Sequence, residues 1–410
     1  MIDFELSSRA RMIQDMARAF ALNNIRPYAR QADTEGKMPE EVIRQLASFG
    51  MVGGSMPLGR EREELGAESE PKENNLLAVV GAEQMAYGDP AVIMNIPGPG
   101  LAAPAINAMG TPEQKERFLG IFQKNDGKLR YGAYAYTEAH FGSDTSQVAT
   151  TAKRDGDEWV LNGRKIFCTN GARADIVVVF ATVDKSLGRE GIKAFVVEKG
   201  TPGFEVGKIE DKLGIKASET AELILDNVRV PMDNLLGGEA ALDPKRKAGF
   251  IGAMKTFDST RPMVAALALG IGQAAFDYVK EWVRTEIKAG YPFKKRTEVS
   301  LTLADAEREL AISRHLIWRA AWMADRSIPN TREASMAKAY APQAAYRVCR
   351  DAVRIMGPEG YSKEHLVEKW YRDIKIYDIF EGTGQIQRVV ISRRILGYLD
   401  KDDEDSSKAA

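Results

Sequence analysis

The chain has 410 residues, of which 44% are hydrophobic and 28% are charged, and its formal net charge at pH 7 is −1. One hydrophobic core rarely serves so long a chain, so two or three packed units are expected, and the near-neutral charge gives no electrostatic reason to expect nucleic acid as a partner. Two cysteines, Cys168 and Cys349, are too few for a disulfide framework, and no Cys/His spacing indicates a metal site.

The first 130 residues carry apolar residues at helical spacing, as in Leu6–Phe20 and Val42–Phe49, which predicts an N-terminal helical domain over residues 1–130. Two prolines and two glycines within 97–100 predict a break between helices. The N-terminus has early acidic residues and no apolar run, unlike a signal peptide, and no stretch approaches the ~20 apolar residues of a membrane span. We therefore expect a cytoplasmic protein.

Residues 131–245 change to short β-type runs, which predicts a small antiparallel β domain. Asp155-Gly156 and Asn162-Gly163 have the composition of tight turns. The candidate strands are Trp159–Leu161, Ile176–Phe180, Phe195–Val197 and Leu223–Leu225.

Residues 246–400 return to long helical patterns, as in Leu303–Ala324 and Tyr340–Ile355, where Pro342 predicts a kink or break. This region is expected to form a C-terminal four-helix bundle, followed by a disordered acidic tail over 401–410. Helices, strands and helices in succession, without Rossmann alternation, make the fold class α+β.

One segment near the C-terminus carries a candidate for chemistry: Glu381 is followed directly by Gly382, Thr383 and Gly384, and then by an amphipathic helix. One interpretation is a simple helix entry with Thr383 as the N-cap. The other is that the glycines let the backbone approach a ligand, while the helix start offers N–H groups to phosphate.

Phe380–Arg388 resembles the catalytic segment of the acyl-CoA dehydrogenase family, and the resemblance runs in order over nearly the whole chain. Thr137–Asp144 is similar to the family's flavin loop, and Lys165–Gly171 is similar to its flavin strand. The resemblance implies that Glu381 is the catalytic base, that FAD is the cofactor and that an acyl-CoA is the substrate. It also implies an electron-transferring flavoprotein as electron acceptor and a homotetramer or heterotetramer in which subunits share FAD.

The resemblance implies further site residues. Thr260 stands where some subfamilies carry the base. Arg261 is either a substrate contact or a buried ion-pair partner, and Pro262 is expected at a helix start. The implied substrate contacts are Ser143, Phe257, Asp258, Arg261 and Gly382, and the implied cofactor contacts are Tyr134, Tyr136, Thr137, Gly142, Ser143, Phe167, Cys168, Thr169, Thr383, Gly384 and Gln385.

The chain departs from the family pattern at the expected adenosine end of FAD. Arg284 stands without the usual Phe-Gly and Gln, and Gly357 and Gly360 belong to an altered Gly-Gly-x-Gly. His140 replaces a small residue of the flavin loop and is interpreted as loop packing. An acyl-CoA oxidase that uses O₂ and a non-catalytic partner subunit remain as alternatives.

The acyl group is addressed only by the break at 97–100. One interpretation is a turn away from the pocket. The other is a wider cavity that favours a branched, cyclic or aryl-bearing acyl group. Residues 87–100 contain no Lys or Arg, which disfavours a dicarboxylic acyl group.

Overall fold

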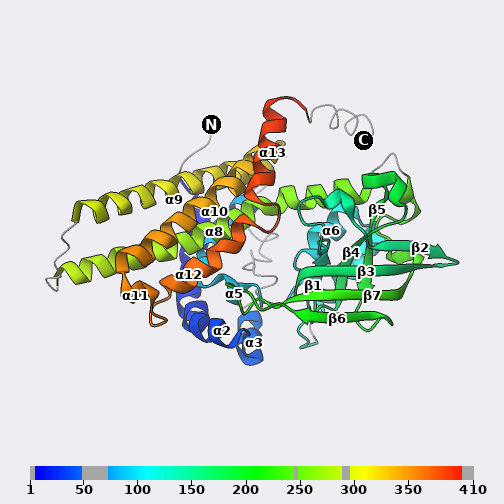
Figure 1. The fold of residues 1–410 in the computed structure, drawn as a ribbon, viewed down its shortest axis with the longest axis horizontal. Coiled ribbons are helices and arrows are strands. Elements are labelled where there is room, and N and C mark those ends of the chain that lie inside the picture. Colours follow the sequence, from blue (N-terminus) through cyan, green and yellow to red (C-terminus); the bar gives the residue numbers. More distant parts are fainter. Residues whose placement is uncertain (1–4, 49–72, 125, 244–247, 289–295, 399–410) are drawn as a thin grey trace.

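The computed structural model describes residues 5–48, 73–124, 126–243, 248–288 and 296–398, without the side chains of 248–259, 287, 288 and 296. The expected tail at 401–410 lies outside the described residues. Figure 1 shows a helical part at one end, a β-sheet at the other, and one long helix that runs across both.

The N-terminal region is helical, as predicted. On α1 the buried residues are Ala10, Ile13 and Ala17, whereas Met12 and Met16 are 54% and 51% exposed. Small residues occupy the buried face because they let neighbouring helices approach closely. The helices are α1 (Ser8–Phe20), α2 (Ala29–Glu35), α3 (Glu40–Ser48), α4 (Asn74–Gly88), α5 (Pro90–Ile93), α6 (Ala102–Met109) and α7 (Pro112–Gly120).

The predicted break at 97–100 is confirmed, because α5 ends at Ile93 and α6 begins at Ala102. Gly98 N donates to Arg130 O at 2.8 Å, and Gly132 N donates to Gly98 O at 2.9 Å. A Cβ on Gly132 would collide with the carbonyl of Pro99. The absence of side chains therefore serves a close backbone contact between this segment and the first strand.

The middle region forms a seven-stranded sheet in the order β1-β4-β2-β3-β7-β6, with β5 also paired to β4. Most pairings are antiparallel, as predicted, but β1 and β2 run parallel to β4. All four candidate strands are confirmed. The strands are β1 (Gly132–Ala135), β2 (Thr151–Asp155), β3 (Glu158–Thr169), β4 (Ile176–Thr182), β5 (Ile192–Glu198), β6 (Phe204–Ile209) and β7 (Thr220–Pro231).

The two predicted turn dipeptides have different outcomes. Asp155-Gly156 joins β2 to β3, with Gly156 at φ 60°, as predicted. Asn162-Gly163 instead lies inside β3, where the register with β7 shifts between Leu161 and Gly163. A Cβ on Gly163 would collide with Thr150, so this glycine permits an irregularity inside a strand and not a turn.

The C-terminal region is a bundle in which α8, α9 and α10 pack together and α13 lies against α10. Pro262 lies inside α8 and not at its start, which corrects that expectation, and α10 continues through Pro342, so no break occurs there. Each ring removes one helical hydrogen bond, and packing against neighbouring helices offsets the loss. The helices are α8 (Ala248–Lys288), α9 (Arg296–Asp325), α10 (Thr331–Met356), α11 (Pro358–Tyr361), α12 (Val367–Asp373) and α13 (Gly384–Ile395).

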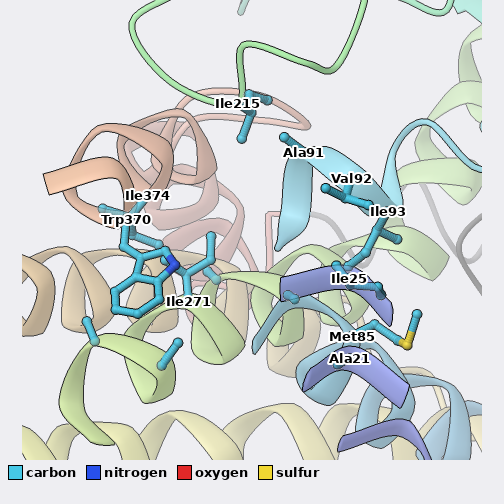
Figure 2. Close-up of a cluster of buried hydrophobic side chains, with 14 of the residues drawn as sticks. Ala21, Ile25, Met85, Ala91, Val92, Ile93, Ile215, Ile271, Trp370 and Ile374 are labelled. Carbon is cyan, nitrogen blue, oxygen red and sulfur yellow. The ribbon is translucent and has the colours of Figure 1, made fainter. Parts of the chain in front are cut away.

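The largest buried cluster joins all three regions (Figure 2). It contains Met85 of α4, Ile215 of the β6–β7 connection, Ile271 of α8 and Trp370 of α12. The apolar stretch Thr260–Glu286 of α8 is long enough to cross a membrane, but 72% of its most apolar window is buried inside the protein. That burial is typical of a core helix of a bundle.

Candidate active site

The Glu381 loop, residues 377–384, connects the 3-10 turn Ile374–Asp378 to α13. Glu381 and Gly382 both have left-handed backbones, at φ 53° and φ 90°. A Cβ on Gly382 would collide with the Gln387 amide. Thr383 caps α13 by accepting a hydrogen bond from Ile386 N at 3.2 Å, so the predicted N-cap is confirmed.

Gly384 is required by local packing as well. A Cβ there would collide with the Asp378 carboxylate and would lie 3.3 Å from the Gln343 amide. Gln385 follows as an exposed residue in the first turn of α13. The cofactor contacts implied for Thr383, Gly384 and Gln385, and the substrate contact implied for Gly382, stay predictions.

The carboxylate of Glu381 meets the middle of α8. Thr260 Oγ1 donates a hydrogen bond to Glu381 Oε2 at 2.6 Å, so the residue at the alternative base position contacts the predicted base. Glu381 as a whole is half-buried, but its carboxyl group lies among protein atoms. This burial has the largest influence on the pKa of Glu381 and raises it. The Thr260 hydrogen bond and the charges of Lys338 and Arg261 partly oppose this rise.

Arg261 and Tyr134 surround the same carboxylate. Arg261 is buried, and its charge acts on Glu381; whether it is a substrate contact or an ion-pair partner stays a prediction. Tyr134 on β1 lies close enough that the Glu381 charge adds to the effect of burial, and its pKa is raised well above 10. The strand β1 and the Glu381 loop are therefore coupled electrostatically.

A buried ion pair fixes the segment after β1. Lys165 Nζ of β3 donates to Glu138 Oε1 at 2.8 Å, and both side chains are almost fully buried. Glu138 also accepts from Ala149 N, Thr150 N and Thr150 Oγ1 at 2.6–3.0 Å. These donors and the lysine charge hold the pKa of Glu138 below its usual range despite burial, whereas burial lowers the pKa of Lys165.

The candidate flavin face consists of Thr137, Phe167 and Thr169. Ile166 N donates to Thr137 O at 2.9 Å, which joins the two segments. The β3–β7 register shifts between Lys165 and Cys168, and Phe167, at φ 55°, is turned outward with 58% of its surface exposed. An exposed aromatic ring, with a threonine in each of the two joined segments, fits a flat flavin ring with hydrogen-bonding edges.

The remaining predicted residues of this region have different surroundings. Cys168 points into the sheet core, where burial raises its pKa to about 12, so only its backbone is left for a cofactor. Tyr136 is buried, packs on Phe180 and donates to Thr145 O at 3.1 Å. The exposed residues are Gly142, Ser143 and His140, and His140 lies edge-on to Phe141.

The residues predicted for the adenosine end lie elsewhere. Arg284 is exposed and pairs with Glu281 at 3.6 Å. Gly357, at φ 63°, ends α10, and a Cβ on Gly360 would press on the carbonyl of Val353. Figure 1 shows α11 and the C-terminal end of α8 at the end of the molecule opposite the sheet, so one chain does not bring them to the flavin face.

The structure identifies one contact residue that sequence reasoning missed. Lys338 on α10 is fully buried, and its Nζ donates to backbone carbonyls of the Glu381 loop. The available signal was a lysine within the alanine-rich face of an amphipathic helix. The side chains of Phe257 and Asp258 lie outside the described part of α8.

Comparisons with known proteins agree with this arrangement. The acyl-CoA dehydrogenase models for the N-terminal, middle and C-terminal domains match residues 7–124, 133–228 and 247–396. A short-chain specific acyl-CoA dehydrogenase of Clostridium acetobutylicum is 36% identical over 396 residues, which cover 96% of this chain and 100% of that protein.

Two solved structures are similar over the same extent. Butyryl-CoA dehydrogenase from Megasphaera elsdenii superimposes with a TM-score of 0.84 at 37% identity, covering 96% of this chain and 100% of that chain. A chain from a structure described as an electron transferring flavoprotein of Acidaminococcus fermentans superimposes with a TM-score of 0.83 at 36% identity, with the same coverage.

Proposed function

The chain belongs to the acyl-CoA dehydrogenase family, and from this premise we propose that it oxidises a short acyl-CoA to the 2-enoyl-CoA, with FAD as cofactor. The observation that carries the proposal is the position of Glu381. Its carboxylate has a raised pKa, accepts a hydrogen bond from Thr260, and acts electrostatically on Tyr134 of the strand that leads to the flavin face. Electrons pass to an electron-transferring flavoprotein, a role supported by the name of the similar structure from Acidaminococcus fermentans.

Glu381 is the base that takes the α-proton of the thioester. A carboxylate in water is a weak base, but burial of its carboxyl raises its affinity for a proton. The Thr260 hydroxyl fixes the orientation of the accepting carboxylate by bonding one of its oxygens. FAD, when bound, supplies the acceptor for the hydride that leaves the β-carbon.

A short, straight acyl group is our choice of substrate class. The similar proteins are named for short-chain substrates and for butyryl-CoA. The glycines at 97–100 contact the backbone of residues 130–132, which supports the interpretation of this break as a structural turn. A panel of acyl-CoA thioesters tests the choice, and higher kcat/KM for every branched, cyclic or aryl-bearing acyl group than for butyryl-CoA would reverse it.

The activity itself is tested by mixing FAD-loaded protein anaerobically with butyryl-CoA and recording the flavin absorbance. We expect rapid bleaching and formation of crotonyl-CoA. Bleaching that is absent with every thioester, in protein with full FAD content, would contradict the function and support a non-catalytic partner subunit. In air, hydrogen peroxide formed in step with thioester consumption would support the oxidase alternative.

We further propose a cytoplasmic tetramer, homomeric or heteromeric, that serves β-oxidation chemistry. Support comes from exposed apolar side chains on the bundle, since large exposed apolar patches are typical of interaction sites. These are Leu301 and Ile312 on α9 and Val389, Ile395 and Leu396 at the C-terminal end. Light scattering tests the assembly: an FAD-saturated monomer would contradict it, and an FAD-poor oligomer would indicate a missing partner chain.

A further inference from the structure

Lys338 lies at a buried position, where placing a charged side chain costs free energy. Its side chain is 0% exposed, and it shares the buried face of α10 with Ala334, Ala337 and Ala341, which are also fully buried. Moving an ammonium group out of water costs several kcal/mol unless polar partners replace the water. A lysine at such a position therefore needs a specific set of contacts to be tolerated.

Those contacts are backbone carbonyls on either side of the glutamate. Lys338 Nζ donates to Tyr377 O at 2.7 Å and to Gly382 O at 3.1 Å. Gln387 Nε2 also donates to Gly382 O at 3.1 Å. One ammonium group thus joins the start of the Glu381 loop to the residue directly after Glu381.

The loop needs such support because its backbone is strained. Glu381 has φ 53°, a left-handed conformation that costs a non-glycine residue about 1–3 kcal/mol and persists only when the surroundings impose it. If the loop relaxed toward an ordinary backbone conformation, the carboxylate would turn relative to Thr260 and the flavin face. A displacement of 1 Å at a reacting group lowers a rate by roughly 100-fold.

We propose that Lys338 is the positioning residue of the Glu381 loop, and that its ammonium group, by holding the carbonyls of Tyr377 and Gly382, keeps the carboxylate in the orientation that removes the substrate proton. This role rests on the proposed function of Glu381 as the base. Lys338 acts through the loop and through its charge.

The charge of Lys338 also acts on Glu381. The titratable and charged groups around the pair are Asp378 and Tyr377 on the loop, Arg261 on α8 and Tyr134 on β1. Burial lowers the pKa of Lys338 to about 8, against the opposing effect of the Glu381 charge. The lysine charge in turn restrains the rise of the Glu381 pKa.

The directions of these two pKa shifts predict two changes in the pH profile of kcat/KM. Because burial lowers the pKa of Lys338 to about 8, we expect its charge to be lost at alkaline pH and wild-type activity to decline there. Loss of the charge by mutation raises the pKa of Glu381, so the acid limb moves to higher pH. A residue with a merely structural role would shift neither limb.

The test compares wild-type, Lys338→Met and Lys338→Arg holoenzymes with butyryl-CoA. We expect Lys338→Met to lose roughly 100-fold in kcat with a much smaller change in KM, and to show an acid limb at higher pH. Lys338→Arg keeps a permanent charge, so we expect partial recovery of kcat and an alkaline limb displaced above that of the wild type. Lys193→Met, a buried lysine of β5 in the sheet, is the matched control and keeps the wild-type profile.

The possible outcomes distinguish a failure of the positioning role of Lys338 from a failure of the proposed acyl-CoA dehydrogenase activity. A wild-type enzyme that turns over, with a Lys338→Met variant within threefold of its kcat and with unshifted limbs, overturns the role of Lys338 alone. If Lys338→Met does not fold, the wild-type and Lys338→Arg profiles decide: coincident alkaline limbs overturn the proposal, and a displaced limb in the arginine variant supports it. A wild-type holoenzyme that bleaches with no thioester overturns the proposed function, and this role with it.

Discussion

Two glutamates in this protein lie in low-solvent surroundings near a buried lysine, and their proton affinities move in opposite directions. Glu138, between β1 and β2, has a pKa below its usual range, whereas the pKa of Glu381, before α13, is raised. Burial pushes both values upward. The difference therefore comes from the partners and not from depth alone.

The partners differ in what they bind. Glu138 accepts hydrogen bonds from Lys165 Nζ, Thr150 Oγ1 and two backbone N–H groups. Among the side chains that the structure describes, only Thr260 donates to Glu381, because Lys338 gives its hydrogen bonds to carbonyls of the loop. A buried lysine thus favours the anionic form of Glu138. The other buried lysine holds the backbone instead of the carboxylate, which leaves Glu381 able to accept a proton.

The largest expected effect is a loss of activity on substitution of Glu381, the reactive member of the two glutamates. Glu381→Gln preserves the shape of the side chain but removes the group that accepts the proton. We expect kcat to fall by about 10²–10⁴-fold, with fold, FAD content and thioester binding retained. Stopped-flow flavin bleaching and exchange of the substrate α-hydrogen with deuterated water measure the loss, and a decrease below tenfold contradicts the role of Glu381.

The next effect is a loss of stability when Glu138, the structural member of the two glutamates, loses its lysine partner. Lys165→Met leaves the Glu138 carboxylate buried without its cation, so we expect the free energy of unfolding to fall by about 3–5 kcal/mol. Chemical denaturation measures it, with Lys208→Met as control, because Lys208 is exposed and solvent screens its pairing with Glu210. An equal loss in both variants would contradict the importance of burial.

The same pair gives a pH dependence of stability. Because the folded pKa of Glu138 lies below its unfolded value near 4.5, its contribution is complete above that pH and is lost as the pH falls through the folded pKa. We therefore expect the difference in unfolding free energy between wild type and Glu138→Gln to shrink at acidic pH.

A smaller effect sharpens the comparison by removing the donor to Glu381. Thr260→Val deletes the hydroxyl that opposes the rise in the Glu381 pKa, so we expect the acid limb of kcat/KM to move to higher pH. Thr285→Val, on the exposed part of the same helix, is the matched control. Coincident acid limbs in the two variants would show that the hydrogen bond has no influence on the base.

The smallest expected effect concerns Tyr377, whose buried hydroxyl has no hydrogen-bond partner among the described residues. Tyr377→Phe removes a polar group that gains nothing from burial, so we expect the free energy of unfolding to stay the same or to rise by up to about 1 kcal/mol. Lys338 bonds the carbonyl of Tyr377, which the substitution leaves in place. A clear loss of stability would mean that the hydroxyl has a partner.

The sequence was sufficient for the order of helical and β regions, the strands and the N-cap at Thr383, since these depend on short-range patterns. It did not predict the bulge that exposes Phe167, because a one-residue register shift leaves no mark in the composition. The helix start expected at Pro262 and the break expected at Pro342 were wrong, since tertiary packing overrides the local preference of proline. Lys338 was missed because a helical lysine normally points to solvent, and only the fold brings it to a loop that follows 39 residues later.

The length of α8 bears on how the protein unfolds. This helix has 41 residues, about 60 Å at 1.5 Å per residue, and it packs on β5 as well as on α4, α9 and α10. The helix α8 packs against both the sheet and the bundle. Unfolding of one part of α8 would therefore expose apolar surface in both regions. We therefore expect the slowest-exchanging amide hydrogens to occur in both the sheet and the bundle. We also expect the two regions to unfold in one cooperative step, although they occupy different parts of the molecule.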